Sequence, residues 1–123
     1  MKLHADRNEH LNTITAYGED WVDINGARHH GALLIQPTGP ILPWQVDTFE
    51  ALTADDFQAL RQMQPEVILL GTGERLRFPA PALTRSLMEA RIGLEVMDVV
   101  AACRTYNILM GEGRQVLAAL LRR

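Results

Sequence analysis

The feature that most constrains the fold is an uninterrupted apolar run at residues 67–70, which continues directly into Gly71-Thr72-Gly73. A strand with one face in water alternates apolar and polar residues, whereas a strand covered on both faces is apolar throughout. Four residues are too few for a buried helix but enough for a strand. The run therefore predicts a strand inside a sheet with a layer packed on each side, the usual state of a parallel sheet.

A helix is predicted just before this strand, in the segment LTADDFQALRQMQP. Thr53 has the side chain of an N-cap, and Asp56 follows at the spacing of a capping box. Phe57 and Leu60 lie on one helical face and are expected in the core. Pro65 ends the helix because it cannot donate the next backbone hydrogen bond.

Helical and extended segments continue to alternate after the glycine turn. Pro81 is expected to open a helix with Leu83, Leu87 and Ala90 on one face, and Gly93 is expected to be its C-cap. Further predictions are a strand in LEVMD, a helix from about residue 99 to 112 capped by Asp98 and closed by Gly113, and a strand at 114–121. Right-handed crossovers then make the strands near 67–71, 94–97 and 114–121 parallel, as a βαβαβ unit.

The N-terminal half carries the strongest short hairpin signal, Asn25-Gly26, because both residues tolerate a positive φ. Val22 and Ile24 alternate with polar neighbours before the turn, and residues 33–35 are expected to form a more deeply buried return strand. The segment TGPILPW reads as a loop anchored by Trp44. Together these features predict an α/β fold, with a mixed sheet, a parallel βαβαβ C-terminal half and an N-terminal antiparallel hairpin.

Length and composition narrow the classes of function. The 123 residues fit one domain, and a net charge of −3 gives no electrostatic footprint for nucleic acid or an anionic membrane. A single cysteine, Cys103, excludes an intramolecular disulfide and favours a reducing compartment. The first ten residues contain no apolar segment of the kind found in a secretory signal peptide. No apolar run approaches the roughly 18 residues that span a bilayer. We expect a cytoplasmic protein that is not integral to a membrane.

The glycine turn is the first candidate site, because ligands of open parallel sheets bind beyond the carboxyl ends of strands. A candidate crevice for a small molecule gathers there: Gly71, Thr72, Gly73, Arg75, Asp98, Arg104 and Asn107. Phosphate loops, however, lead directly into a helix, whereas this turn leads into the extended segment ERLRF. No dinucleotide-binding or Walker motif is present, so a plain turn is favoured and no cofactor is predicted. For Arg104 and Asn107, a surface arginine and a hydrogen-bonded asparagine are the favoured interpretation.

Other reactive side chains point to structural roles. Cys103 falls in an apolar helical stripe at 99, 102, 103, 106, 109 and 110, where a cysteine packs as a small hydrophobe. His4, His10, His29 and His30 lack chelating spacing, and adjacent histidines on a strand face opposite ways. Asp55 and Asp56 offset a helix dipole. We therefore predict no catalytic residue and no metal site.

Five segments in order, YGEDWVDINGARHHGALLIQP, PILPW, PEVILLGTGERLRFP, GLEVMD and AACRTYNILMGEGRQV, carry a family resemblance. From about Thr13 to Leu121 the chain resembles the small family that includes mitochondrial complex I assembly factor 3 and many uncharacterised bacterial proteins. The matching positions are Gly71, Thr72, Gly73, Arg77, Phe78, Pro79, Tyr106, Asn107 and Glu112. The resemblance implies one compact three-layer α/β domain over residues 1–123.

The resemblance also sets two expectations for function. The eukaryotic relative helps to build NADH:ubiquinone oxidoreductase through protein contacts, and no enzymatic activity or catalytic residue is carried over from the family. The first expectation is a non-enzymatic interaction protein with protein partners in respiratory complex assembly. The alternative is a small-molecule binder or enzyme that uses the crevice at Gly71–Gly73. From the first residues we expect no mitochondrial presequence of the kind that organellar members need, and this expectation fits a bacterial homologue.

Overall fold

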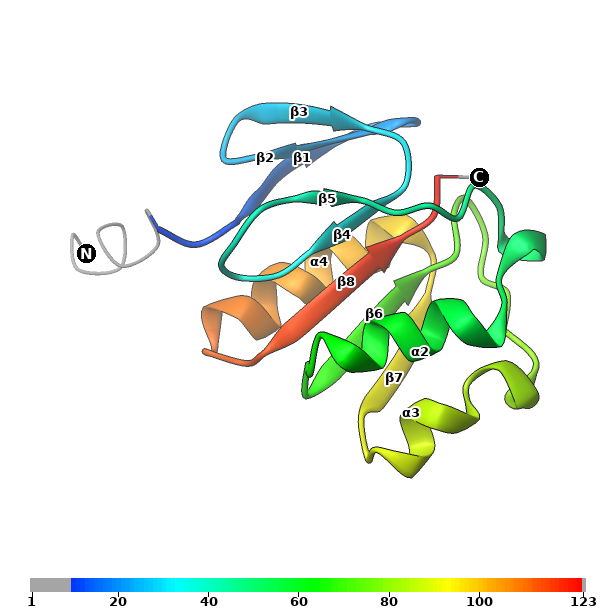
Figure 1. Ribbon diagram of the computed structural model, residues 1–123. Helices are drawn as coiled ribbons and strands as arrows, with labels where there is room; N and C mark the ends of the chain where they lie inside the picture. Colours follow the sequence, from blue (N-terminus) through cyan, green and yellow to red (C-terminus); the bar gives the residue numbers. More distant parts are fainter. Residues whose placement is uncertain (1–9, 123) are drawn as a thin grey trace.

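A five-stranded sheet forms the centre of the computed structural model, which describes residues 10–122 (Figure 1). Its strand order is β5-β4-β8-β6-β7. The strands are β4 (Leu33–Ile35), β5 (Leu42–Pro43), β6 (Val67–Gly71), β7 (Gly93–Met97) and β8 (Val116–Leu120). β6 pairs in parallel with both β7 and β8, whereas β4 pairs antiparallel with β8 and β5 antiparallel with β4. The sheet is therefore mixed, with a parallel C-terminal half as predicted.

The apolar run at 67–70 occupies the middle of this parallel half. Val67 pairs with Gly93 on one side and Val116 on the other, and the register continues unbroken to Gly71. All five residues of β6 are buried, as are all five of β8. A strand with neighbours on both edges and layers on both faces has no position for a polar side chain, which explains the uniform composition.

Helices and a second sheet cover the two faces. α2 (Ala54–Gln62) and α3 (Arg85–Glu89) lie on one face, and α4 (Val99–Gly111) lies on the other (Figure 1). Two 3₁₀ turns, η1 (Phe49–Ala51) and η2 (Pro81–Leu83), precede α2 and α3. The side chains of β6 alternate between two cores: Ile68 packs with Phe57 of α2, and Leu69 packs with Tyr106 of α4. The domain is thus three-layered, as the family resemblance implied.

Capping residues set the start of α2 and both ends of α4 where the sequence indicated. Thr53 and Asp56 form a reciprocal capping box at the start of α2. The Asp98 carboxylate accepts a hydrogen bond from the Ala101 N–H at 2.8 Å and caps α4. Gly113, with φ of 82°, closes α4, and the next N–H donates back to Leu109 O at 3.0 Å. Both ends of α4 are therefore fixed by local sequence.

The predicted return strand of the N-terminal hairpin was wrong. The turn at Asn25-Gly26, with positive φ at both residues, pairs Ile24 with Ala27. A three-stranded antiparallel sheet results, with β1 (Ile14–Tyr17), β2 (Trp21–Ile24) and β3 (Ala27–His30). Residues 33–35 instead form β4 of the larger sheet. Three consecutive buried residues need cover on both faces, which that sheet provides and the half-exposed hairpin does not.

The helix predicted from Pro81 to a C-cap at Gly93 is also different in the structure. It is divided into η2 and the short α3, whose C-cap is Ala90. Arg91 adopts a positive φ of 59°, and the Ile92 N–H closes the helix end on Leu87 O at 3.0 Å. Gly93 is the first residue of β7, where its N–H donates to Glu66 O. An arginine therefore supplies the left-handed residue that we expected from glycine.

Within residues 10–122, no helix combines the length and the hydropathy needed to traverse a lipid bilayer. The leader prediction for the N-terminus and the interpretation of His4 lie outside the described residues.

Candidate functional site

The two glycines of the turn each meet a packing or backbone requirement. A Cβ at Gly71 would lie 2.9 Å from Leu120 Cδ2 and 3.2 Å from Ala102 Cβ, so its absence lets α4 approach the sheet. Gly73 has φ of 94°, a left-handed value that other residues adopt only with strain. Its carbonyl accepts the Val99 N–H at 2.9 Å, the first amide of α4. This hydrogen bond joins the end of the turn to the start of α4.

Thr72 is fully buried and holds the following loop closed. Its hydroxyl donates to Arg75 O at 2.7 Å and accepts the Arg77 N–H at 3.1 Å. A cavity of about 360 Å³ lies beside it, lined by Thr72, Glu74, Arg75 and Arg77. The hydroxyl is therefore occupied by the loop backbone, and the charged side chains of the loop form most of the cavity wall.

The rest of this loop is fixed through Arg77. Its guanidinium lies over the Phe49 ring, 4.6 Å from the ring centroid, and pairs with Glu50. The pKa of Glu50 is held below its ordinary value, first by its own backbone N–H and then by Arg77. The anchored loop leaves Leu76 49% exposed and Phe78 70% exposed. These two apolar side chains are presented to solvent from a loop that is tied at both ends.

The structure does not bring all seven residues of the predicted crevice together. Thr72 and Arg75 line the cavity described above, whereas Asp98 caps α4. Asn107 lies nine residues further along α4, about 13 Å from the cap. Its amide donates to Ile14 O at 2.8 Å and accepts the Ile14 N–H at 3.0 Å, which fixes β1 to the helix. Arg104 lies on the exposed part of α4.

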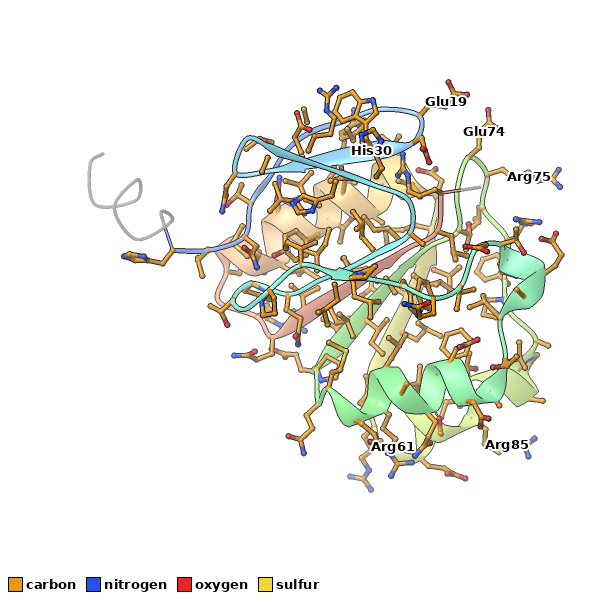
Figure 2. All side chains as sticks on the ribbon, turned by 45° about the horizontal axis from the view of Figure 1, so that its top comes forward. Glu19, His30, Arg61, Glu74, Arg75 and Arg85 are labelled. Carbon is orange, nitrogen blue, oxygen red and sulfur yellow. The ribbon has the colours of Figure 1, made fainter. Side chains whose placement is uncertain are left out.

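A larger cavity of about 640 Å³ lies between the β1–β2 turn and the N-terminus of α4. Apolar walls come from Tyr17, Val99 and Val100, and Gly73 contributes backbone. Glu19 and Glu74 project from neighbouring turns at the same end of the molecule (Figure 2). Sequence reasoning missed this cavity because its walls come from segments that are far apart in the sequence, such as those of Tyr17 and Val99.

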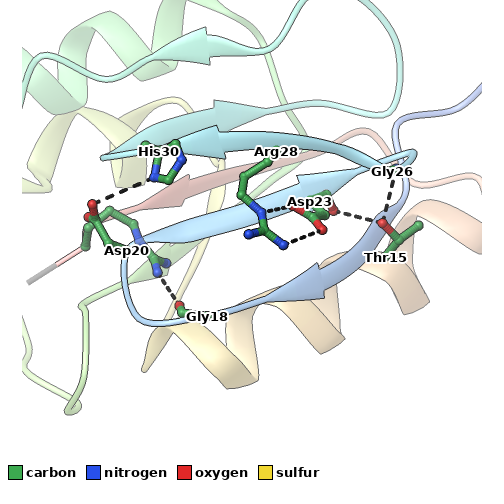
Figure 3. Close-up of polar contacts among 8 residues, drawn as sticks. Thr15, Gly18, Asp20, Asp23, Gly26, Arg28 and His30 are labelled. Carbon is green, nitrogen blue, oxygen red and sulfur yellow. Dashed lines mark hydrogen bonds and ion pairs between the residues drawn. The ribbon is translucent and has the colours of Figure 1, made fainter.

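The β1–β2 turn that forms one wall is fixed from both sides. Gly18 lies under the Trp21 ring, where any Cβ would come within 2.3 Å of the ring, and Arg28 stacks on that ring at 3.6 Å. The Arg28 guanidinium also pairs with Asp23 at 2.9 Å and lowers the pKa of that carboxyl (Figure 3). From the other side, Arg122 Nη2 donates to Gly18 O. The wall is therefore preformed.

Cys103 and Tyr106 of α4 lie in the hydrophobic core, as the apolar stripe of this helix predicted. Burial raises the pKa of the Cys103 thiol from 9.0 to about 11, with a smaller opposing effect of Arg122. Burial also raises the pKa of Tyr106, whose hydroxyl donates to Asn12 O at 2.7 Å. A thiol with a raised pKa is protonated at neutral pH and is a poor nucleophile.

The histidines of β3 lie apart, because successive residues of a strand face opposite sides. His30 is exposed and lies 4.0 Å from Asp20, whereas His29 is half-buried (Figure 3). Across the described part of the chain, no group of three or more His, Cys, Asp or Glu side chains is arranged to hold a metal ion.

The fold and its glycine turn define a class of small three-layer α/β domains. A solution structure from Bordetella pertussis described as a Mth938-like domain is 37% identical, with a TM-score of 0.81, covering 99% of this chain and 92% of that one. A crystal structure from Bordetella parapertussis is 44% identical, with a TM-score of 0.85 over 90% and 95% of the two chains.

Sequence relatives identify the family more closely. The family described as protein of unknown function (DUF498/DUF598) matches residues 14–121, and this chain belongs to it. NADH dehydrogenase (ubiquinone) 1 alpha subcomplex assembly factor 3 of Bos taurus is 31% identical over 110 residues, which are 88% of this chain and 59% of that protein. The chain thus spans about three fifths of this relative. The resemblance drawn from the sequence is confirmed.

Proposed function

We propose that this chain is a non-enzymatic interaction protein of the cytoplasm that helps to assemble a respiratory or other membrane-associated complex. The observation that carries the proposal is the shared family with an assembly factor of NADH dehydrogenase. The chain matches 59% of the length of that relative, so the assembly role is proposed for this chain and not taken from the relative.

The use of the polar side chains supports a binding rather than a chemical role. Thr72 closes a loop, Asp98 caps a helix, and Asn107 and Tyr106 attach the N-terminal segment to α4. The hydrogen bonds of these groups therefore stabilise the fold. The exposed apolar side chains of Leu76 and Phe78, by contrast, lie on a loop that Thr72 and Arg77 hold in place, where they can contact another protein.

Deletion of the gene in its native host tests the proposal. We expect isolated membranes to lose NADH:quinone oxidoreductase activity and native gels to show less of the assembled complex, with recovery when the gene is returned. Succinate dehydrogenase activity in the same membranes is the internal control. Normal amounts of active complex in the deletion strain would refute the assembly role.

The second candidate is a small-molecule site at the Gly71–Gly73 turn. It is favoured by the cavity of about 360 Å³ lined by Thr72 and Arg75. Titration of the ¹⁵N-labelled protein with inorganic phosphate and with ADP separates this function from the first. Saturable shifts of the amides of residues 72–77 would support a ligand site, and unchanged spectra would leave the turn with its structural role alone.

A further inference from the structure

We propose that two copies of this chain associate as a symmetric dimer, in which the loop at Arg75–Phe78 of each copy occupies the 640 Å³ cavity of the other. This inference goes beyond the proposed function, because it assigns a binding partner to a surface rather than a cellular role. It depends on two features that lie next to each other in the fold: a cavity with an apolar wall and an acidic rim, and a loop with apolar and basic side chains.

The cavity supplies the acceptor half of the interface. Its apolar wall includes Tyr17 and Val100. Val100 lies in the first turn of α4, and its side chain is 41% exposed. The volume is within the range of about 300–1,000 Å³ typical of pockets that enclose a small ligand. Burying this wall removes apolar surface from water, which favours association.

The rim of the cavity is acidic. Glu19, Asp20 and Glu74 contribute three carboxylates, and all three side chains are exposed. The one guanidinium in the wall, that of Arg122, donates from Nη2 to Gly18 O. Its Nε and Nη1 are buried and have no hydrogen-bond partner among the described residues. Three carboxylates outnumber this one guanidinium, so the lining keeps a net negative charge. The charge of the rim therefore favours an apolar occupant flanked by cations.

The loop at 75–78, Arg-Leu-Arg-Phe, has this chemistry. Leu76 and Phe78 are 49% and 70% exposed, and between them Arg77 is held by Glu50 and Phe49. Arg75 is exposed, and no described carboxylate lies within ion-pair distance of its guanidinium. The loop thus presents apolar side chains beside an available cation.

The positions of the two features permit a closed dimer. Glu74 lines the cavity and Arg75 begins the loop, so both halves adjoin on one surface, and Figure 2 shows Glu19, Glu74 and Arg75 at the same end of the molecule. A two-fold axis near this position lets each loop reach the other copy's cavity, which gives a self-complementary interface. Because the cavity wall and the loop are both fixed before association, little ordering is required.

Sedimentation equilibrium of the full chain from about 5 μM to about 500 μM provides the first measurement, since association follows mass action. We expect the mean mass to rise from 13.8 kDa and to level off at twice that value. A mass that stays monomeric over the whole range would overturn the proposal, and so would a mass that continues to rise past the dimer.

Charge reversal on the two halves provides the decisive test. Glu19→Arg and Arg75→Glu should each weaken self-association about tenfold or more, because like charges then face each other. An equimolar mixture of the two variants should recover the wild-type dissociation constant, because both contacts of the mixed dimer again join opposite charges. Failure of the mixture to recover would refute this pairing even if each variant alone were monomeric.

Two further variants separate charge from packing and control for folding. Val100→Ser should weaken the dimer while leaving the rim intact, and Arg85→Glu, at the opposite end of the molecule in Figure 2, should leave association unchanged. The amide spectrum of each variant reports whether it is folded. Dimerisation and the deletion phenotype are measured separately, so a monomeric protein with an assembly role, or a dimer without one, identifies which proposal has failed.

Discussion

At the scale of single residues, Tyr106 both fills the core and fixes the N-terminal segment. Its side chain has no exposed surface, and its hydroxyl donates to Asn12 O at 2.7 Å. Tyr106→Ala should lower the free energy of unfolding by about 3–5 kcal/mol through a cavity. Tyr106→Phe should cost only about 1 kcal/mol, since it removes one hydrogen bond. Urea unfolding measures both, and a loss below about 1 kcal/mol for the alanine variant would contradict the core role.

Cys103 should behave as a core residue rather than a reactive thiol. It is 1% exposed, and burial raises its pKa to about 11. Native protein at pH 7 should react with iodoacetamide far more slowly than free cysteine does, and urea should restore the rate. Cys103→Ser should cost about 1–3 kcal/mol by burying a hydroxyl without an assured partner. Labelling of the folded protein at the rate of a free thiol would rule out the core interpretation.

At the scale of elements, the contact between α4 and β6 depends on Gly71. Gly71→Ala places a methyl group 2.9 Å from Leu120 Cδ2 and should cost about 1–3 kcal/mol through overpacking. Shortening the neighbouring side chain in the double variant Gly71→Ala/Leu120→Val should recover part of this loss. Strictly additive losses in thermal unfolding would show that the predicted clash is not the cause.

Asn107 is the element-scale connection between α4 and β1. Asn107→Ala leaves the N–H and C=O of Ile14 without their partner and should cost about 1–3 kcal/mol. Hydrogen exchange should accelerate most at the Ile14 amide. Arg104→Ala is the matched control on the same helix, and as a surface change it should stay within about 0.5 kcal/mol. A larger effect at Arg104 than at Asn107 would show that this account of α4 is incorrect.

At the scale of the whole molecule, stability should fall as the pH rises from about 9 to about 11. The pKa of Cys103 is about 11 in the folded protein and 9.0 when unperturbed. Between these values the unfolded chain has lost the thiol proton and the folded chain has kept it, so rising pH favours unfolding. The free energy of unfolding falls by at most about 2.7 kcal/mol, because the pKa of Cys103 differs by about 2 between the folded and the unfolded chain.

The comparison of wild type with Cys103→Ala isolates this effect. Denaturant unfolding of both proteins at a series of pH values should show a shallower decline for the alanine variant. The raised pKa of Tyr106 contributes in the same direction from about pH 10 upward in both proteins. The two curves should therefore become parallel only above about pH 11, where the effect of Cys103 is complete. Identical slopes for both proteins between pH 9 and 11 would contradict the prediction.

Local patterns predicted the elements whose causes are local. The strand at 67–70, the capping box of α2, the start of α4 at Asp98 and its end at Gly113 were all found as predicted. In each case the determining interaction joins residues a few positions apart, or the composition of one run reports that it is covered on both faces. The parallel order of β6, β7 and β8 followed because right-handed crossovers leave few alternatives.

Only the tertiary structure decided which sheet receives residues 33–35 and which polar side chains meet. The sequence shows that these residues are buried but not what covers them. For Asn107 it favoured a hydrogen-bonded asparagine over a place in the crevice, but only the structure shows that the partner is Ile14, 93 positions away. The large cavity likewise joins Tyr17, Val100 and Arg122. The local sequence by itself determined the elements and their caps, because those interactions are short in sequence. Long-range packing decided the sites, since contacts between distant segments leave no local pattern.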